Sequence, residues 1–174
     1  VLAANYTLGV GDGRAGRRWA VVIGAGEHED PALPDVAFPI DGALYVRDVL
    51  LSGHLPWDEV LSLTGGRATE SEVMEAISRF ATNITPDDDL YVFIAGGTLI
   101  GDDSAQFLIA ADTDTVTRRG IDLSLLQLQL GAYRAKNVFV ALDLVPLTAV
   151  QAVAVQFKAL TATSDEQRDD LDEP

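Results

Sequence analysis

The sequence predicts an α/β fold in which helices cover both faces of a mostly parallel sheet. Continuous apolar runs bounded by turn residues recur along the chain, which is typical of strands buried on both faces. Segments with the apolar period of an amphipathic helix lie between these runs, and such alternation favours a parallel sheet. The 174 residues suit one domain, and 48% apolar residues are enough for a core.

Four apolar runs predict the central strands, at residues 19–24, 59–63, 90–95 and 137–142. The third run is expected to end at Gly96-Gly97, because paired glycines interrupt a strand. Shorter strands are expected at residues 6–10, 106–110 and 156–163.

Helices are expected over residues 41–51, 69–82 and 122–130. Asp41 and Asp122 have side chains that cap helix N-termini. Thr69 opens a capping box that Glu72 completes. The residues expected to face the core are Ala43, Val46, Val49 and Leu50 in the first helix and Val73, Ile77, Phe80 and Ala81 in the second.

The charge excludes two classes of partner. The formal net charge is -15, whereas nucleic acids and anionic membranes are bound by basic patches. Basic partners or cations are favoured instead. The chain has no cysteine, so it lacks disulfides and cysteine nucleophiles, and the compartment stays open between cytoplasmic and secreted or periplasmic. No apolar run approaches the roughly 20 residues of a membrane span.

Ligands bind at the carboxyl ends of strands in such sheets, so the loops there deserve inspection. The first reads Gly24-Ala25-Gly26-Glu27-His28-Glu29, in which Glu29 stands where a dinucleotide fingerprint needs its third glycine. Of the two histidines, His28 is better placed for catalysis than His54, which follows a helix. No Gly-x-Ser-x-Gly motif is present, which disfavours a common α/β hydrolase.

Four further acids follow the strands expected at residues 90–95 and 106–110: Asp102, Asp103, Asp112 and Asp114. Carboxylates are the ligands that calcium prefers, although the spacing does not fit an EF-hand and aspartates are common in turns. With His28, these acids could instead hold a divalent metal for hydrolysis. Calcium is the only cofactor that the sequence suggests.

The order of segments resembles the caspase-like proteases, especially the bacterial and metacaspase-type members. For example, Phe107-Leu108-Ile109-Ala110-Ala111-Asp112-Thr113-Asp114 resembles the family's Tyr-Leu-Leu-Pro-x-Asp-x-Asp. The matching stretches are residues 18–24, 30–34, 41–43, 85–93, 107–114, 138–143 and 160–167. The resemblance implies a three-layer caspase-like fold over residues 18–167, incomplete at its C-terminal edge. It leaves residues 1–17 as a flexible lead-in and 168–174 as an acidic, disordered tail.

The chain departs from this family where the chemistry lies. Ala95-Gly96-Gly97-Thr98 stands where the family has Ser-Gly-His-Gly, so Gly97 replaces the catalytic histidine. Asp143-Leu144-Val145 stands where the family has Asp-x-Cys, so Val145 replaces the nucleophile. Cysteine proteolysis needs a thiolate and an activating base, so the resemblance implies a catalytically inactive pseudo-protease rather than an enzyme.

The resemblance also implies a pocket for a basic side chain. Asp41 and Asp143 match the family's acidic pocket positions, with Phe38 and Ala95 as neighbours, and two carboxylates would favour Arg or Lys. The alternative is that Asp41 only caps a helix and Asp143 only ends a strand.

We therefore expect a pseudo-protease that binds a protein or basic peptide in regulation or scaffolding. The partner could be an active caspase-like subunit or the rest of a longer parent chain. The alternative functions are a metal-dependent hydrolase that uses the acidic loops, and an α/β module with a structural role.

Overall fold

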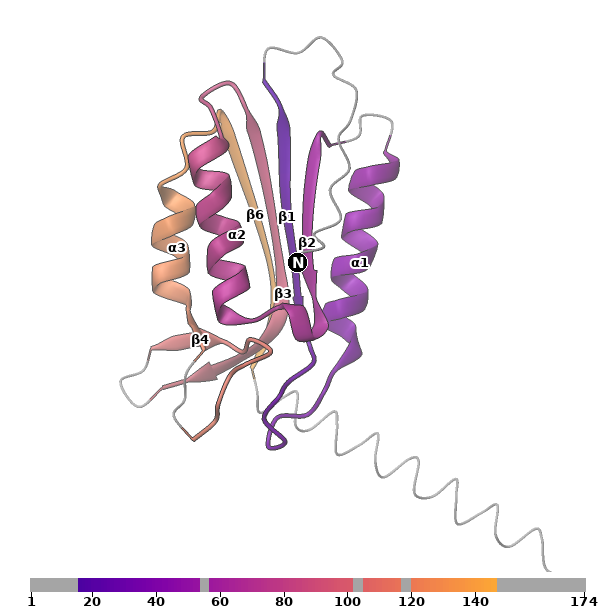
Figure 1. Ribbon diagram of the computed structural model, residues 1–174, viewed down its shortest axis with the longest axis vertical. Helices are drawn as coiled ribbons and strands as arrows, with labels where there is room; N and C mark the ends of the chain where they lie inside the picture. The colour runs from indigo at the N-terminus through magenta and orange to yellow at the C-terminus, as the bar shows by residue number, and fades with distance from the viewer. Residues whose placement is uncertain (1–15, 54–56, 102–104, 117–119, 147–174) are drawn as a thin grey trace, which may run out of the picture.

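The computed structural model describes residues 16–53, 57–101, 105–116 and 120–146. Within them the chain forms an α/β fold with a six-stranded mixed sheet and three α-helices (Figure 1). In chain order the elements are β1 Arg18–Ala25, α1 Ala37–Ser52, β2 Glu59–Thr64, the 3-10 turn η1 Gly65–Arg67, α2 Glu70–Asn83, β3 Asp89–Ile100, β4 Gln106–Leu108, β5 Ile121–Asp122, α3 Leu123–Gly131 and β6 Asn137–Pro146. The strands expected at 6–10 and 156–163, the tail at 168–174 and most of the lead-in lie outside the described residues.

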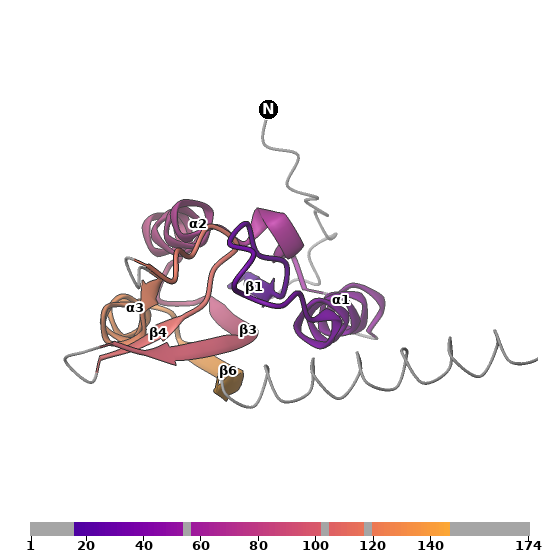
Figure 2. The same ribbon diagram turned by 90° about the horizontal axis from the view of Figure 1, so that it is seen from below.

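The four long strands run parallel, with β1 between β2 and β3 and with β6 on the other side of β3. The two short strands β4 and β5 pair antiparallel. Residues 101–105 are too few for a parallel crossover, which needs a dozen or more, so β4 folds back on β3 as a hairpin. The sheet is consequently mixed and curled (Figure 2), which corrects the prediction of a mostly parallel, three-layer arrangement.

α1 lies on one side of β1, and α2 and α3 lie on the other (Figures 1 and 2). Val21 and Ile23 pack into the core cluster that contains α2 and α3 residues. Ala20 and Val22 point the other way and pack against Ala43 of α1. Successive side chains of a strand alternate between faces, so a strand covered on both faces must be apolar at every position.

Two of the three predicted helix starts are confirmed. Thr69 Oγ1 accepts a hydrogen bond from the Glu72 N–H at 3.2 Å, and Asp122 accepts one from the Ser124 N–H at 2.7 Å. The third prediction is wrong, because α1 begins at Ala37 with Val36 as its N-cap rather than at Asp41. Pro39 falls in the first turn, where a missing N–H costs no intrahelical hydrogen bond, so the proline does not block the helix.

Of the eight helix residues expected to face the core, four are buried, and two more, Val46 and Leu50, are partly buried against it. Phe80 of α2 is buried and meets Trp19 of β1 edge-on, with ring centroids 5.4 Å apart. Ala81 and Val49, in contrast, are exposed. Their helices pack through other positions, so these two core assignments are wrong.

The third strand does not end at its paired glycines. β3 continues through Gly96-Gly97 to Ile100, and its last residues pair with β4. A Cβ on Gly96 would lie 2.9 Å from Leu108 Cδ1, so the missing side chain lets β4 approach closely. None of the described helices is long and apolar enough to cross a membrane.

Candidate functional site

The carboxyl ends of β3 and β6 lie side by side. Gly97 pairs with Val145, and Ala95 pairs with Asp143. Adjacent strands lie about 4.8 Å apart, so the two positions that differ from the protease pattern are direct neighbours. A Cβ on Gly97 would lie 3.0 Å from Ile109 Cδ1, so Ile109 crowds the place of a side chain there. Neither residue offers a titratable or nucleophilic group.

Near the carboxyl ends of the strands, three residues in register form a row across the sheet: Gly24 on β1, Ala95 on β3 and Asp143 on β6. A Cβ on Gly24 would lie 2.5 Å from the Pro39 carbonyl oxygen, so this row faces α1. Residues in register on parallel strands point to the same face. The Asp143 side chain therefore projects from the face that α1 partly covers.

Asp41 reaches the same level from α1. Its neighbour Ile40 has its Cα 3.1 Å from the position of a Gly24 Cβ. Phe38 lies three residues earlier, hence on the same side of the helix as Asp41. Asp41 and Asp143 are exposed and Phe38 is 42% exposed, whereas Ala95 is fully buried. Ala95, unlike the other three residues, therefore presents no surface to a ligand.

Neither Asp41 nor Asp143 has a hydrogen-bond or ion-pair partner within residues 16–53, 57–101, 105–116 and 120–146. Since α1 begins earlier, capping no longer explains Asp41. We name the three exposed residues Phe38, Asp41 and Asp143 the acidic surface. It offers two carboxylates and an aromatic ring to solvent.

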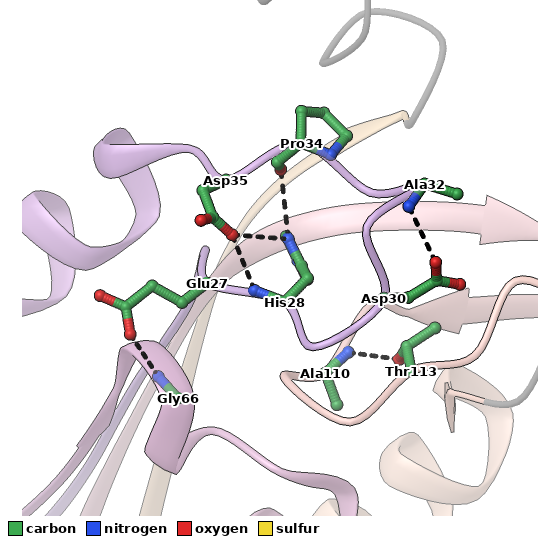
Figure 3. Close-up of polar contacts among 9 residues, drawn as sticks. All are labelled: Glu27, His28, Asp30, Ala32, Pro34, Asp35, Gly66, Ala110 and Thr113. Atoms are coloured by element: carbon green, nitrogen blue, oxygen red, sulfur yellow. Dashed lines mark hydrogen bonds and ion pairs between the residues drawn. The ribbon is translucent and has the colours of Figure 1, made fainter.

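The acids of the loop between β1 and α1, unlike Asp41 and Asp143, accept hydrogen bonds from backbone N–H groups (Figure 3). Glu27 Oε2 accepts from the Gly66 N–H at 2.8 Å, and Asp35 accepts from the His28 N–H at 2.9 Å. Asp30 accepts from Ala32 and from the Thr115 hydroxyl and backbone N–H. These bonds, those from Thr115 foremost, lower the pKa of Asp30. Glu27 and Asp30 therefore connect this loop to segments that are distant in the chain, at Gly66 and Thr115.

His28 is also part of this loop structure. Its side chain is only 3% exposed, and Nδ1 lies 3.2 Å from the Pro34 carbonyl oxygen. A carbonyl only accepts, so Nδ1 carries the proton. Burial lowers the pKa of His28, outweighing the hydrogen bond to Pro34 and the nearby charges of Asp35 and Asp30, which raise it. A buried, neutral ring suits a structural role better than a role as solvent-facing base.

This burial predicts a pH dependence of stability. The folded-state pKa of His28 lies below its ordinary value of 6.5, so the unfolded chain takes up the proton more readily. The free energy of unfolding should therefore fall as the pH drops from about 7.5 to 5.5. His28→Gln should reduce this fall. Urea denaturation at both pH values measures the effect, and an equal fall in the wild type and the variant would contradict it.

The four acids proposed for a metal are not assembled in the described part of the chain. Asp112 accepts from the Glu70 N–H at 2.8 Å at the start of α2, and Asp114 accepts from the Val116 N–H at 2.7 Å. Asp102 and Asp103 lie outside the described residues. Among those described, no three His, Cys, Asp or Glu side chains are placed to hold a metal. Calcium binding by the full set stays a prediction.

Sequence reasoning missed the structural use of these acids, although a signal was present. Asp30 and Asp114 each accept from the N–H two residues later, which is the Asx-turn pattern. The proline after Asp30 is a further turn signal.

The described residues form an α/β domain in which Asp41 and Asp143 are exposed and Gly97 and Val145 lie side by side on adjacent strands. No family model matches the chain, and no curated protein matches it in sequence. Among solved structures it is similar to protein GSU0716 from Geobacter sulfurreducens, with a TM-score of 0.57 and 17% identity. The similarity covers 75% of this chain and 50% of that one, so this chain spans about half of that protein's length. At this identity the likeness concerns the fold alone.

Proposed function

We propose that this chain is a catalytically inactive, caspase-like domain that binds a basic segment of a protein or peptide. The observation that carries the proposal is the pairing of Gly97 with Val145 at the ends of adjacent strands. The resemblance assigns a histidine and a cysteine to these positions, and their proximity is what a catalytic dyad would need. With glycine and valine there, binding is the activity left to this edge.

The acidic surface supports a basic ligand. Asp41 and Asp143 are both exposed, and a guanidinium or ammonium group could bind either carboxylate through charge-assisted hydrogen bonds. The exposed ring of Phe38 offers a face for an Arg side chain. The net charge of -15 attracts basic partners from a distance.

Removing the carboxylate of Asp143 should weaken this binding. Asp143→Asn keeps the size of the side chain but removes its charge, so the Kd for an Arg-containing peptide should rise about tenfold. Asp87→Asn is the matched control, since Asp87 is an exposed acid just before β3, at the opposite end of the sheet. Fluorescence anisotropy with a library of labelled Arg peptides at low salt measures both. Equal affinities for the wild type and the two variants would refute the acidic surface as the binding site.

The proposed lack of proteolytic activity is tested separately. The purified chain is incubated with a broad peptide library, once with calcium and once with a chelator, and mass spectrometry detects products. No cleavage is expected in either condition. Cleavage that the chelator abolishes would overturn the proposal and favour the metal-dependent hydrolase instead.

A further inference from the structure

Helix α3 carries large apolar side chains on the side that faces away from the core. Leu126 and Leu130 are buried beneath the helix, whereas Leu125 is 55% exposed and Leu128 is 71% exposed. The helix lies at the flank of the molecule, next to α2 and away from α1 (Figure 1). A helix that is apolar on all sides is normally covered on all sides. The outer side of α3 is therefore expected to meet another surface.

The segment that contains this helix has no acidic residue. Among the described residues, the longest stretch without Asp or Glu is 123–142, although the whole chain has 27 acids and a net charge of -15. The only charged residues in that stretch are Arg134 and Lys136. Two copies of a strongly acidic protein repel each other, and burying an unpaired carboxylate between them is costly. An acid-free surface is therefore where this chain can best meet a second copy of itself.

The outer side of α3 also has room for a side chain from another molecule. A shallow hollow of about 470 Å³ lies on it, lined by Ser124, Gln127, Leu128, Gly131 and Ala132. Nothing outside its own helix turn lies within 4 Å of a Cβ position on Gly131, and its φ is not positive. Neither packing within the described residues nor the backbone thus requires a glycine there. Because glycine is a poor helix former, its presence favours a surface that a partner approaches closely.

An antiparallel pair of α3 helices is self-complementary about Leu128, which lies in the middle of the outer side. A twofold axis at Leu128 brings the residues three or four positions before it opposite those three or four positions after it. Leu125 of one copy then lies against Ala132 of the other, and Ser124 lies against Gly131. A large side chain therefore meets a small one on each side of the axis, as close helix packing requires.

The two ends of such a helix pair match in charge as well. Asp122 is the N-cap of α3, and Arg134 follows the last turn. In the antiparallel arrangement, the Asp122 end of one helix lies beside the Arg134 end of the other, and the helix dipoles oppose each other favourably. A parallel pair would place like charges and like dipole ends together. The charges therefore favour the antiparallel arrangement.

We propose that the outer side of α3 is the interface of a homodimer, in which two copies pack their α3 helices antiparallel about a twofold axis at Leu128. Closed twofold dimers are the commonest assemblies of identical chains. One short helix from each copy buries less surface than an obligate interface does, so we expect a reversible dimer with a Kd of roughly 1–100 μM. This inference does not depend on the proposed binding function, whose residues lie on α1 and β6.

Sedimentation equilibrium of the full chain, from about 1 to 300 μM, tests the proposal. Salt at about 150 mM screens the acids that lie away from the interface. Leu128→Asp places two like charges on the twofold axis and should raise the dimer Kd at least about tenfold. Tyr45→Asp is the matched control, since Tyr45 is 72% exposed on α1, across the sheet, and it should leave the Kd unchanged. Circular dichroism reports whether both variants keep their helices.

Disulfide formation gives a second measurement, which also determines the orientation of the helices. The chain contains no cysteine, so each engineered cysteine is unambiguous. Leu128→Cys should form a disulfide between two copies, because this residue meets its own symmetry mate. Leu125→Cys alone should not do so, whereas Leu125→Cys combined with Ala132→Cys should. The proteins are oxidised at a concentration near the wild-type Kd, and non-reducing electrophoresis separates the products.

Three results would overturn the proposal. A chain that stays monomeric over the whole concentration range has no such interface. A dimer that Leu128→Asp leaves intact forms through a different surface. A disulfide that Leu125→Cys forms by itself, as readily as Leu128→Cys does, would show that the helices pack parallel instead.

Discussion

Asp88→Ala is expected to destabilise the protein by about 3 kcal/mol, one of the two largest effects that the structure predicts. Asp88 is 3% exposed, and its carboxylate accepts from the Arg17 N–H at 2.6 Å and from the Thr85 N–H at 2.8 Å. Alanine would leave both partly buried N–H groups without this acceptor. Asp87→Ala is the matched control, since Asp87 is the exposed neighbour. Urea denaturation of both variants measures the difference.

The position of Asp88 explains the size of this effect. Its carboxylate holds the residue before β1, and its backbone carbonyl accepts from the Lys136 N–H at 2.7 Å, just before β6. The residue thus joins the amino-terminal ends of three neighbouring strands. A loss no larger than that of the Asp87 control would show that water replaces the carboxylate without cost.

Lowering the pH should also reduce the stability that Asp88 contributes. Burial alone would raise the pKa of Asp88, but the hydrogen bonds from Thr85 and Arg17 outweigh it and lower the pKa below the ordinary 3.8. The stabilisation is therefore fully present above pH 3.8 and is lost as the pH falls through the lower, folded-state pKa. The difference in stability between wild type and Asp88→Ala should shrink in that range.

The second large effect is expected from Gly24→Ala. A Cβ on Gly24 would lie 2.5 Å from the Pro39 carbonyl oxygen and 2.7 Å from Ala43 Cβ. The first of these is backbone, so α1 would have to move away from the sheet at a cost of about 3 kcal/mol. Gly42→Ala is the control, because nothing lies within 4 Å of its Cβ position. Alanine favours a helix over glycine, so this control should be stabilised by about 0.5–1 kcal/mol.

Gly24→Ala also connects the fold to the acidic surface. Gly24 sets the distance of α1 from the row that contains Asp143, and Asp41 sits on α1. Displacing the helix should therefore weaken Arg-peptide binding as well as stability, whereas Gly42→Ala should leave binding unchanged. Thermal unfolding and fluorescence anisotropy on the same samples measure both. A wild-type melting temperature for Gly24→Ala would contradict the close approach of α1.

Local patterns were sufficient for several elements. The apolar runs located the four long strands, since a strand buried on both faces must be apolar at every position. Thr69 and Asp122 were recognised as caps from their own side chains. Pro39 misled the prediction of where α1 begins. Proline interrupts a helix interior but is tolerated in the first turn, and the sequence does not distinguish the two cases. Gly96-Gly97 misled the end of β3, because its close neighbour Leu108 belongs to a later element.

The sequence by itself determined the α/β class and the order of the long elements, because these depend on residue type and short-range period. Only the tertiary structure decided that β4 turns the sheet into a mixed one and that the acids of the β1 loop bind backbone N–H groups. These features depend on contacts between segments distant in the chain. The physical reason is that register and packing fix which residues meet, and no local pattern contains that information.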